Sequence, residues 1–212
     1  MKRLLGLLLV MGMVGCGGPV AELEDLGARI KRDGQGEVVR VEFSRSTKIT
    51  DAGLVHLEGM TKLTYLTVNS TQVTDAGLVH LEGLANLETL WLTNTQITDA
   101  GMVHLKGLIK LRALYLAETQ VSDAGLVHLK GLTNLGFLTL WGTQVTDVGL
   151  VHLKGMTNLQ DLSLYNTQIT DAGLVHLKGL TSLRLLHLQG TQITAAGKAK
   201  LQEALPNCNI LR

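Results

Sequence analysis

Aspartate and histidine, two residue types that bind metals and transfer protons, recur along this chain at one fixed spacing. The heptapeptide DAGLVHL, or a near copy of it, occurs six times, at residues 51–57, 75–81, 99–105, 123–129, 147–153 and 171–177. The pattern fits either a metal or acid–base site copied six times or a structural repeat whose function lies elsewhere. The expected positions of the side chains favour the structural repeat.

The spacing of the histidines argues against a metal site. With about 100° per residue on a helix, His56 points about 130° away from Leu54 and Leu57, which we expect to face the core. Histidines of neighbouring units would lie one helix diameter apart, ~10 Å, whereas zinc–nitrogen bonds measure about 2.0–2.1 Å. Ala52 and Met60 stand four residues from His56, where a second ligand would be needed. We therefore expect no metal and no other cofactor.

The aspartates also have a local explanation. Each begins a helical stretch, where a carboxylate is stabilised by the positive end of the helix dipole. The sequence contains no paired carboxylates and no phosphate-binding glycine loop. Asp161, Ser163 and His187 should lie near one another, but on an open surface they make a poor catalytic triad. We therefore predict a protein that is not an enzyme.

The heptapeptide belongs to a 24-residue unit, and these units begin at Thr47, Thr71, Thr95, Thr119, Thr143, Thr167 and Thr191. Within a unit, LETLWLTNT (87–95) alternates in the way that a strand does. TDAGLVHLKG (170–179) supplies a threonine N-cap, an aspartate in the first turn and a closing glycine for a short helix. The glycine two places after each aspartate permits close packing between coils. One unit cannot bury its leucines alone, so the units must stack.

The segment LETLWLTNT fits L-x-x-L-x-L-x-x-T and resembles the leucine-rich repeat family, which usually has asparagine or cysteine at the ninth position. It is most similar to bacterial members rich in TDAGL units, and it also resembles the repeats of F-box substrate receptors. The resemblance covers about residues 38–212. It implies an α/β solenoid, or horseshoe, with a parallel sheet on the concave face and short helices on the convex face. A threonine hydroxyl can still bond to nearby backbone at the ninth position.

The chain is expected to divide into a signal peptide, a tether, an N-terminal cap, six repeats, and a degenerate seventh repeat with a C-terminal cap, at residues 1–15, 16–20, 21–46, 47–190 and 191–212. The caps cover the leucines that an open stack would expose. We expect a helix over 21–33 with Leu23, Leu26 and Ile30 on one face, followed by a strand over 38–43.

The first sixteen residues, MKRLLGLLLVMGMVGC, have the pattern of an export signal. The apolar run is too short to span a bilayer, which requires ~20 residues. Cys16 resembles the lipidated cysteine of bacterial lipoproteins, although Met13 stands where leucine is usual. The resemblance implies a lipid anchor in the cell-envelope membrane; the alternative is an ordinary cleaved signal. Cys208, the other cysteine, would then have no disulfide partner, and we expect it to be buried.

The units differ mainly at the outward strand positions, which hold six of the seven aromatic residues. The candidate binding residues are Tyr65, Trp91, Tyr115, Phe137, Trp141, Asp161, Tyr165 and His187. We expect Trp91 to neighbour Tyr115, and Trp141 to neighbour Tyr165, at about one strand spacing, ~4.8 Å. Small residues should form a shallow floor between them: Ala113, Ala117, Gly136 and Gly142. An apolar patch with a polar rim usually marks a binding site, and Trp and Tyr are favoured anchors.

The sequence therefore predicts a membrane-anchored, non-enzymatic protein that binds a protein or peptide on an aromatic-rich concave face. One alternative is a glycan binder, with polar flanks at Asn69, Asn94, Gln160, Asp161 and Asn166. Two others are a structural envelope protein and a substrate-recognition solenoid like the repeat part of F-box receptors. A net charge of +1 gives no reason to propose nucleic acid as the partner.

Overall fold

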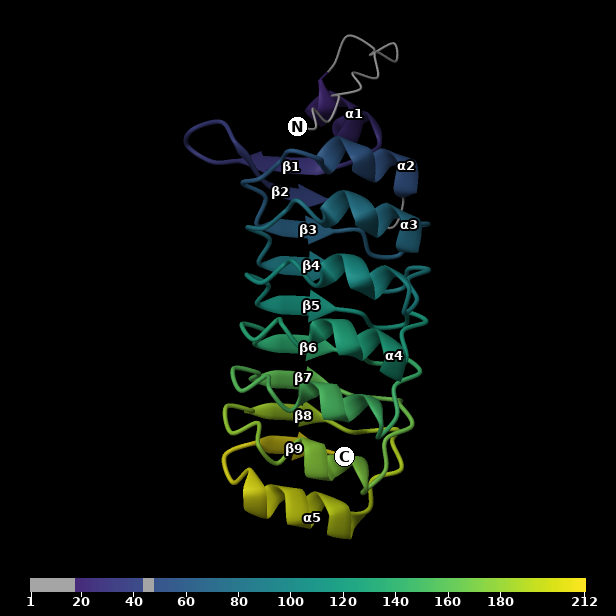
Figure 1. Ribbon diagram of the computed structural model, residues 1–212, viewed down its shortest axis with the longest axis vertical. Coiled ribbons are helices and arrows are strands. Elements are labelled where there is room, and N and C mark those ends of the chain that lie inside the picture. The colour runs from purple at the N-terminus through teal and green to yellow at the C-terminus, as the bar shows by residue number, and fades with distance from the viewer. Residues whose placement is uncertain (1–17, 44–47) are drawn as a thin grey trace, which may run out of the picture.

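The computed structural model describes residues 18–43 and 48–212. The predicted signal peptide, Cys16 and the start of the first repeat lie outside the described residues. Figure 1 shows the rest of the chain as an elongated stack of similar coils, with the strands along one wall. In the described part of the chain, no helix is long and apolar enough to cross a membrane.

One nine-stranded sheet forms that wall, with its strands in chain order from β1 to β9 (Figure 1). Its strands are β1 (Arg29–Arg32), β2 (Val38–Glu42), β3 (Tyr65–Thr67), β4 (Thr89–Trp91), β5 (Ala113–Tyr115), β6 (Phe137–Thr139), β7 (Asp161–Ser163), β8 (Leu185–His187) and β9 (Asn209–Leu211). From β2 to β9 every pair is parallel, and equivalent leucines such as Leu66 and Leu90 stand side by side. The predicted solenoid with one open, largely parallel sheet is confirmed.

The opposite wall consists of short helices, one set in each unit. Three units have an α-helical turn followed by a 3₁₀ turn: α2 (Asp51–Leu54) with η1 (Val55–Leu57), α3 (Asp75–Leu78) with η2 (Val79–Leu81), and α4 (Asp123–Leu126) with η4 (Val127–Leu129). Three units have a 3₁₀ helix only: η3 (Gly101–Leu105), η5 (Gly149–Leu153) and η6 (Gly173–His176). The short helices therefore lie where the sequence predicts them. They are tighter than regular α-helices, as is common for such short runs.

The N-terminal cap differs from the prediction. Helix α1 (Pro19–Asp25) is followed by β1, which runs antiparallel to β2. A continuous helix over 21–33 is therefore wrong. Gly27 adopts a φ of 92°, a left-handed conformation that ends the helix. Leu26 and Ile30 still pack against the core, but Ile30 does so from a strand.

The C-terminal cap consists of one helix and one strand. Helix α5 (Ala195–Ala204) is the longest helix in the described part of the chain, and it leads into β9, which pairs with β8. Cys208 lies between them and is 4% exposed, with a free thiol. The predicted burial of Cys208 is therefore confirmed.

The core is one continuous cluster that runs from Leu23 to Ile210. The ninth-position threonines border it, and each donates its hydroxyl to a carbonyl three residues earlier, as Thr95 does to Leu92 at 2.6 Å. The same bond forms at Thr71, Thr119, Thr143, Thr167 and Thr191. Threonine thus satisfies the backbone of its own turn, as the sequence led us to expect.

The repeated aspartates join each unit to the next. The Ser122 backbone N–H donates to Asp99 Oδ1 at 2.7 Å, and the Ser122 hydroxyl donates to Asp99 Oδ2 at 2.5 Å. The same two bonds link Asp51 to Thr74, Asp75 to Thr98, Asp123 to Thr146, Asp147 to Thr170 and Asp171 to Thr194. The prediction that these aspartates serve only their own helix dipole was therefore incomplete.

The glycine two places after each aspartate is required by the same contact. A Cβ atom at Gly125 would lie 2.5 Å from Asp99 Oδ1, closer than such atoms approach. The nearest obstacle is likewise the preceding unit's aspartate at Gly77, Gly101, Gly149, Gly173 and Gly197. The predicted close packing between coils is confirmed, and the atom that demands it is a carboxylate oxygen.

A double-mutant cycle tests this coupling. Asp99→Ala is expected to lower the free energy of unfolding by about 2–3 kcal/mol, because charge-assisted hydrogen bonds are lost. Gly125→Ala should cost about 1–3 kcal/mol by overpacking. The two losses should not add, since removing the carboxylate makes room for the methyl group. Urea denaturation measures the free energy of unfolding of the two single variants and of the double variant.

Gly131→Ala is the matched control, because nothing lies within 4 Å of a Cβ atom built at Gly131. Its free energy of unfolding should stay close to that of the native protein. Strictly additive losses in the Asp99 and Gly125 cycle would contradict the proposed coupling.

Candidate binding face

The outward positions of the strands form rows that run along the sheet. The first row is Arg40, Tyr65, Thr89, Ala113, Phe137, Asp161, Leu185 and Asn209, and the second is Glu42, Thr67, Trp91, Tyr115, Thr139, Ser163, His187 and Leu211. A third row, two residues farther along each unit, is Asn69, Thr93, Ala117, Trp141, Tyr165 and Gln189. We call these three rows the sheet face. All eight predicted binding residues belong to it.

The predicted aromatic neighbours are in contact. The Trp91 and Tyr115 rings stack, with centroids 3.6 Å apart and planes inclined by 14°. The Trp141 and Tyr165 rings are tilted by 45°, with centroids 5.8 Å apart. The first pair lies in the second row and the other pair in the third row. Phe137 and Tyr165 are the most open of these rings, with 44% and 43% of their surfaces exposed.

Small residues border two open hollows beside these rings. One, of about 340 Å³, lies at Gly136 and Phe137 between Arg112 and Gln160. Another, of about 350 Å³, lies at Trp141 and is lined by Glu118, Gly142 and Asn166, among others. Of the small residues predicted to form a floor, Gly136 and Gly142 line these hollows, whereas Ala113 and Ala117 are buried, at 8% and 3% exposed, and line neither. The sequence analysis did not identify Arg112 and Glu118, which come from the segments flanking the strands.

A third hollow, of about 490 Å³, lies outside the aromatic region. It is polar and is lined by Gln160, Thr181, Ser182, Leu183, Arg184 and Asn207. None of the eight candidate binding residues lines it, although Gln160 of the glycan hypothesis does, so the largest of these three hollows and the predicted aromatic site do not coincide.

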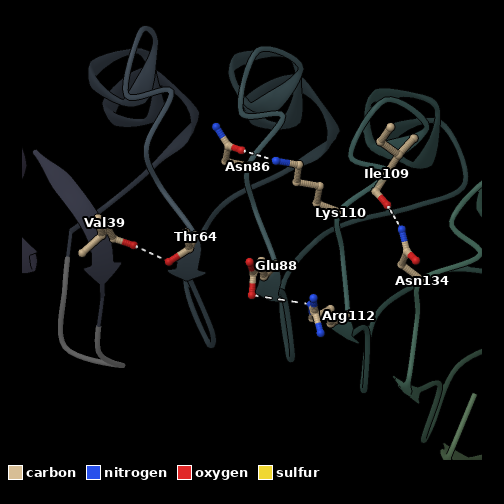
Figure 2. Close-up of polar contacts among 8 residues, drawn as sticks. All are labelled: Val39, Thr64, Asn86, Glu88, Ile109, Lys110, Arg112 and Asn134. Atoms are coloured by element: carbon tan, nitrogen blue, oxygen red, sulfur yellow. Dashed lines mark hydrogen bonds and ion pairs between the residues drawn. The ribbon is translucent and has the colours of Figure 1, made fainter. Parts of the chain in front are cut away.

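Polar bonds connect neighbouring units at the edge where the strands begin (Figure 2). Lys110 Nζ donates to Asn86 Oδ1 at 2.7 Å, and Asn134 Nδ2 donates to the Ile109 carbonyl at 2.8 Å. The Arg112 guanidinium lies a longer 3.7 Å from Glu88, and its side chain is 73% exposed. Most of these groups therefore brace the stack, whereas Arg112 remains accessible beside Phe137.

The turn after each strand explains several polar residues on the other edge. In this turn, one equivalent position of each unit has a positive φ. The residues at that position are Ser70, Asn94, Glu118, Gly142, Asn166 and Gly190. Asparagine tolerates this left-handed conformation better than most residues. The backbone therefore accounts for Asn94 and Asn166, two of the polar flanks in the glycan hypothesis. A third, Asn69, already accepts a bond from the Thr93 N–H at 2.8 Å.

Asp161 is the half-buried carboxylate of the first row. Burial raises the pKa of Asp161, and the nearby charge of His187 partly offsets this rise. The pKa of Tyr115 is raised by burial and, second, by the charge of Asp161. Ser163 and His187 are register neighbours, but among the described residues no hydrogen bond joins Asp161, Ser163 and His187. This trio therefore lacks the contact between nucleophile and base that a catalytic triad uses.

The histidines lie on the helical wall, as predicted, but they are more enclosed than expected. The His80 and His104 side chains are 22% and 25% exposed. Each ring bonds to a glutamate of the preceding unit, with His80 Nδ1 2.6 Å from Glu58 and His104 Nδ1 2.7 Å from Glu82. Across the described ranges, no group of three or more His, Cys, Asp or Glu side chains is placed to hold a metal ion.

The later histidines have different neighbours, because lysine replaces glutamate in that position. His152 shows the effect most clearly: its pKa is lowered first by burial and then by the charge of Lys130. Its Nδ1 atom is buried and has no hydrogen-bond partner in the described part of the protein. The repeated histidines therefore occupy two different electrostatic environments, one beside glutamate and one beside lysine.

Comparisons with known proteins agree with the fold. Two family models match, “Leucine rich repeat” over residues 133–193 and “Leucine Rich repeats (2 copies)” over residues 61–107. The crystal structure of an internalin C2 from Listeria monocytogenes is 25% identical, with a TM-score of 0.63 and 91% of each chain covered. A leucine-rich repeat protein of Leptospira interrogans is 20% identical, with a TM-score of 0.55, and the match covers 74% of this chain and 44% of that one. No curated protein matches the chain.

The environment of His152 predicts a pH dependence of stability. Its pKa is lower in the folded chain than in the unfolded chain, so the unfolded chain takes up the proton first as the pH falls through about 6.5. The stability that the neutral His152 ring contributes is therefore fully present above that pH and declines below it. His152→Gln should therefore reduce the loss of stability between pH 7.5 and pH 5.5, as measured by urea denaturation. An unchanged decline in the variant would refute this assignment.

Proposed function

This chain is a leucine-rich repeat protein, and we propose that it is a membrane-anchored, non-enzymatic binding protein that recognises a protein or peptide on its sheet face. Folds of this kind are typically binding scaffolds. The observation that carries the proposal is the placement of the aromatic residues. Six of the seven in the sequence stand on the sheet face, and the open rings of Phe137 and Tyr165 lie beside hollows or neighbouring rings.

The arrangement of the rings favours a protein or peptide over a glycan. A sugar-binding platform presents a flat ring face to the ligand. Trp91 and Tyr115 instead cover each other's faces at 3.6 Å, and the asparagines expected to contact sugar hydroxyls have structural roles. Partly buried Trp and Tyr with small residues between them are typical of protein-binding hot spots.

Membrane anchoring rests on the sequence of the first sixteen residues. A lipid on Cys16 would lie only three residues before α1, which begins at Pro19. Three residues reach at most roughly 11 Å. The first coil would therefore sit close to the membrane, and so would any partner that reaches the sheet face.

Loss of the aromatic anchors tests the binding proposal. Tagged full-length protein is recovered from envelope extract, and the captured molecules are compared between the native protein and Trp91→Ala/Trp141→Ala. The double variant should lose at least about tenfold in partner recovery, because hot-spot aromatics contribute 2 kcal/mol or more. Circular dichroism checks that the variant remains folded, and digestion with protease or glycosidase identifies the class of partner.

Val127→Ala/Val175→Ala is the control, since it removes two exposed apolar side chains from the helical wall. This control should capture the partner as the native protein does. Undiminished capture by the tryptophan variant would refute binding on the sheet face, and a glycosidase-sensitive partner would favour the glycan alternative.

Replacement of the proposed lipidation site tests the anchor. Cys16→Ser should abolish incorporation of labelled fatty acid and move the protein from the membrane fraction to the soluble fraction. Cys208→Ser is the matched control, because Cys208 is buried in the C-terminal cap and its loss should leave labelling intact. Unchanged membrane association in the Cys16 variant would count against a lipid anchor.

A further inference from the structure

We propose that the sheet face contains a subsite for a cationic side chain, an arginine or lysine of the bound protein or peptide, formed by Asp161 and the Phe137 ring. The inference rests on the function proposed above and specifies what that surface recognises. Phe137 and Asp161 are direct register partners on β6 and β7, in the first row of the sheet face.

The charge distribution of the sheet face singles out Asp161. From β3 to β9, it is the one residue of the three rows, all of which the structure describes, that is an Asp, Glu, Lys or Arg. No ion pair within 4.0 Å involves Asp161 among the described residues, and His187 acts on it only from a greater distance. A half-buried carboxylate without a basic partner has lost hydration without compensation. A cationic ligand would restore a charge-assisted contact.

The same sheet already holds one arginine between an aromatic ring and a carboxylate. At its N-terminal end, the Arg40 guanidinium lies 3.6 Å from the centre of the Tyr65 ring and donates to Glu42 at 2.7 Å. The placement differs, because the register partner of the Tyr65 ring is the cation, whereas the register partner of Phe137 is the carboxylate of Asp161. At β6 and β7 the aromatic ring and the carboxylate are present, and a ligand would supply the cation.

The surroundings suit a long basic side chain. Phe137 exposes 44% of its surface, which leaves a ring available for a cation–π contact. Leu185, on the other side of Asp161 in the same row, is half-buried and can contact the methylene groups of such a side chain. A guanidinium would thus meet a carboxylate and an aromatic ring while its stem packed on apolar surface.

Binding of two small probes to the full-length protein tests the subsite. The probes are N-acetylarginine methylamide and its uncharged near-isostere N-acetylcitrulline methylamide, followed by NMR shifts of the Leu185 methyl groups and the Phe137 ring. The arginine probe should shift these signals and bind at least fivefold more tightly than the citrulline probe. Asp161→Asn should remove that preference. Equal binding of the two probes to the native protein would overturn the proposal.

Glu203→Gln is the matched control, because it removes the same charge from an exposed residue of helix α5, outside the three rows. It should retain the preference for arginine. An equal loss in the Glu203 variant would show an effect of net charge alone and would overturn the subsite.

The partner captured on the sheet face separates failure of the subsite from failure of the proposed function. Loss of the partner in both Asp161→Asn and the Trp91/Trp141 variant supports both. If the Asp161 variant keeps the partner and the tryptophan variant loses it, the subsite is wrong and the binding function stands. If both variants keep the partner, both proposals are wrong.

Discussion

The architecture depends on one contact, in which the aspartate of each unit accepts two hydrogen bonds from the threonine or serine that starts the next helical turn. In the Asp99 case, both carboxylate oxygens are used within 2.7 Å. Because the carboxylate fills the space beside the next turn, the residue there must be glycine, as at Gly125. A hydrogen bond and a steric requirement thus fix the same spacing between neighbouring units, and both contacts recur from unit to unit.

That spacing also sets the arrangement of side chains on the sheet face. With each unit held in one register against the next, equivalent side chains fall into straight rows from β2 to β9. The inward leucines and the aspartate contacts between units stabilise the stack, so the residues of the outward rows can vary without weakening it. Register places Trp91 beside Tyr115, and their ring centroids are 3.6 Å apart.

Much of this could be predicted from the sequence, because a 24-residue period fixes which residues become neighbours. The leucine core, the threonine bonds and the aromatic pairs all follow from it. The contact between each aspartate and the next unit was not predicted. Its threonine or serine partner is 23 residues away, and the helix dipole already offered a local explanation for the aspartate. The helix expected over 21–33 was wrong because Leu26 and Ile30 fit a helical spacing, whereas Gly27 permits the turn that the chain takes. The hollows depend on loop side chains such as Arg112, which no periodicity describes.

The two walls of the stack use charge differently, and this difference bears on recognition. On the helical wall charged side chains are frequent, and some bond to the neighbouring unit, as Glu58 does to the His80 ring at 2.6 Å. On the sheet face they are rare, and the pair formed by Arg40 and Glu42 closes its N-terminal end. A lone carboxylate among apolar neighbours is poorly screened and retains a strong local field. On the binding surface proposed here, the aromatic rings would contribute contact area, while Asp161 would favour a cationic group of the ligand.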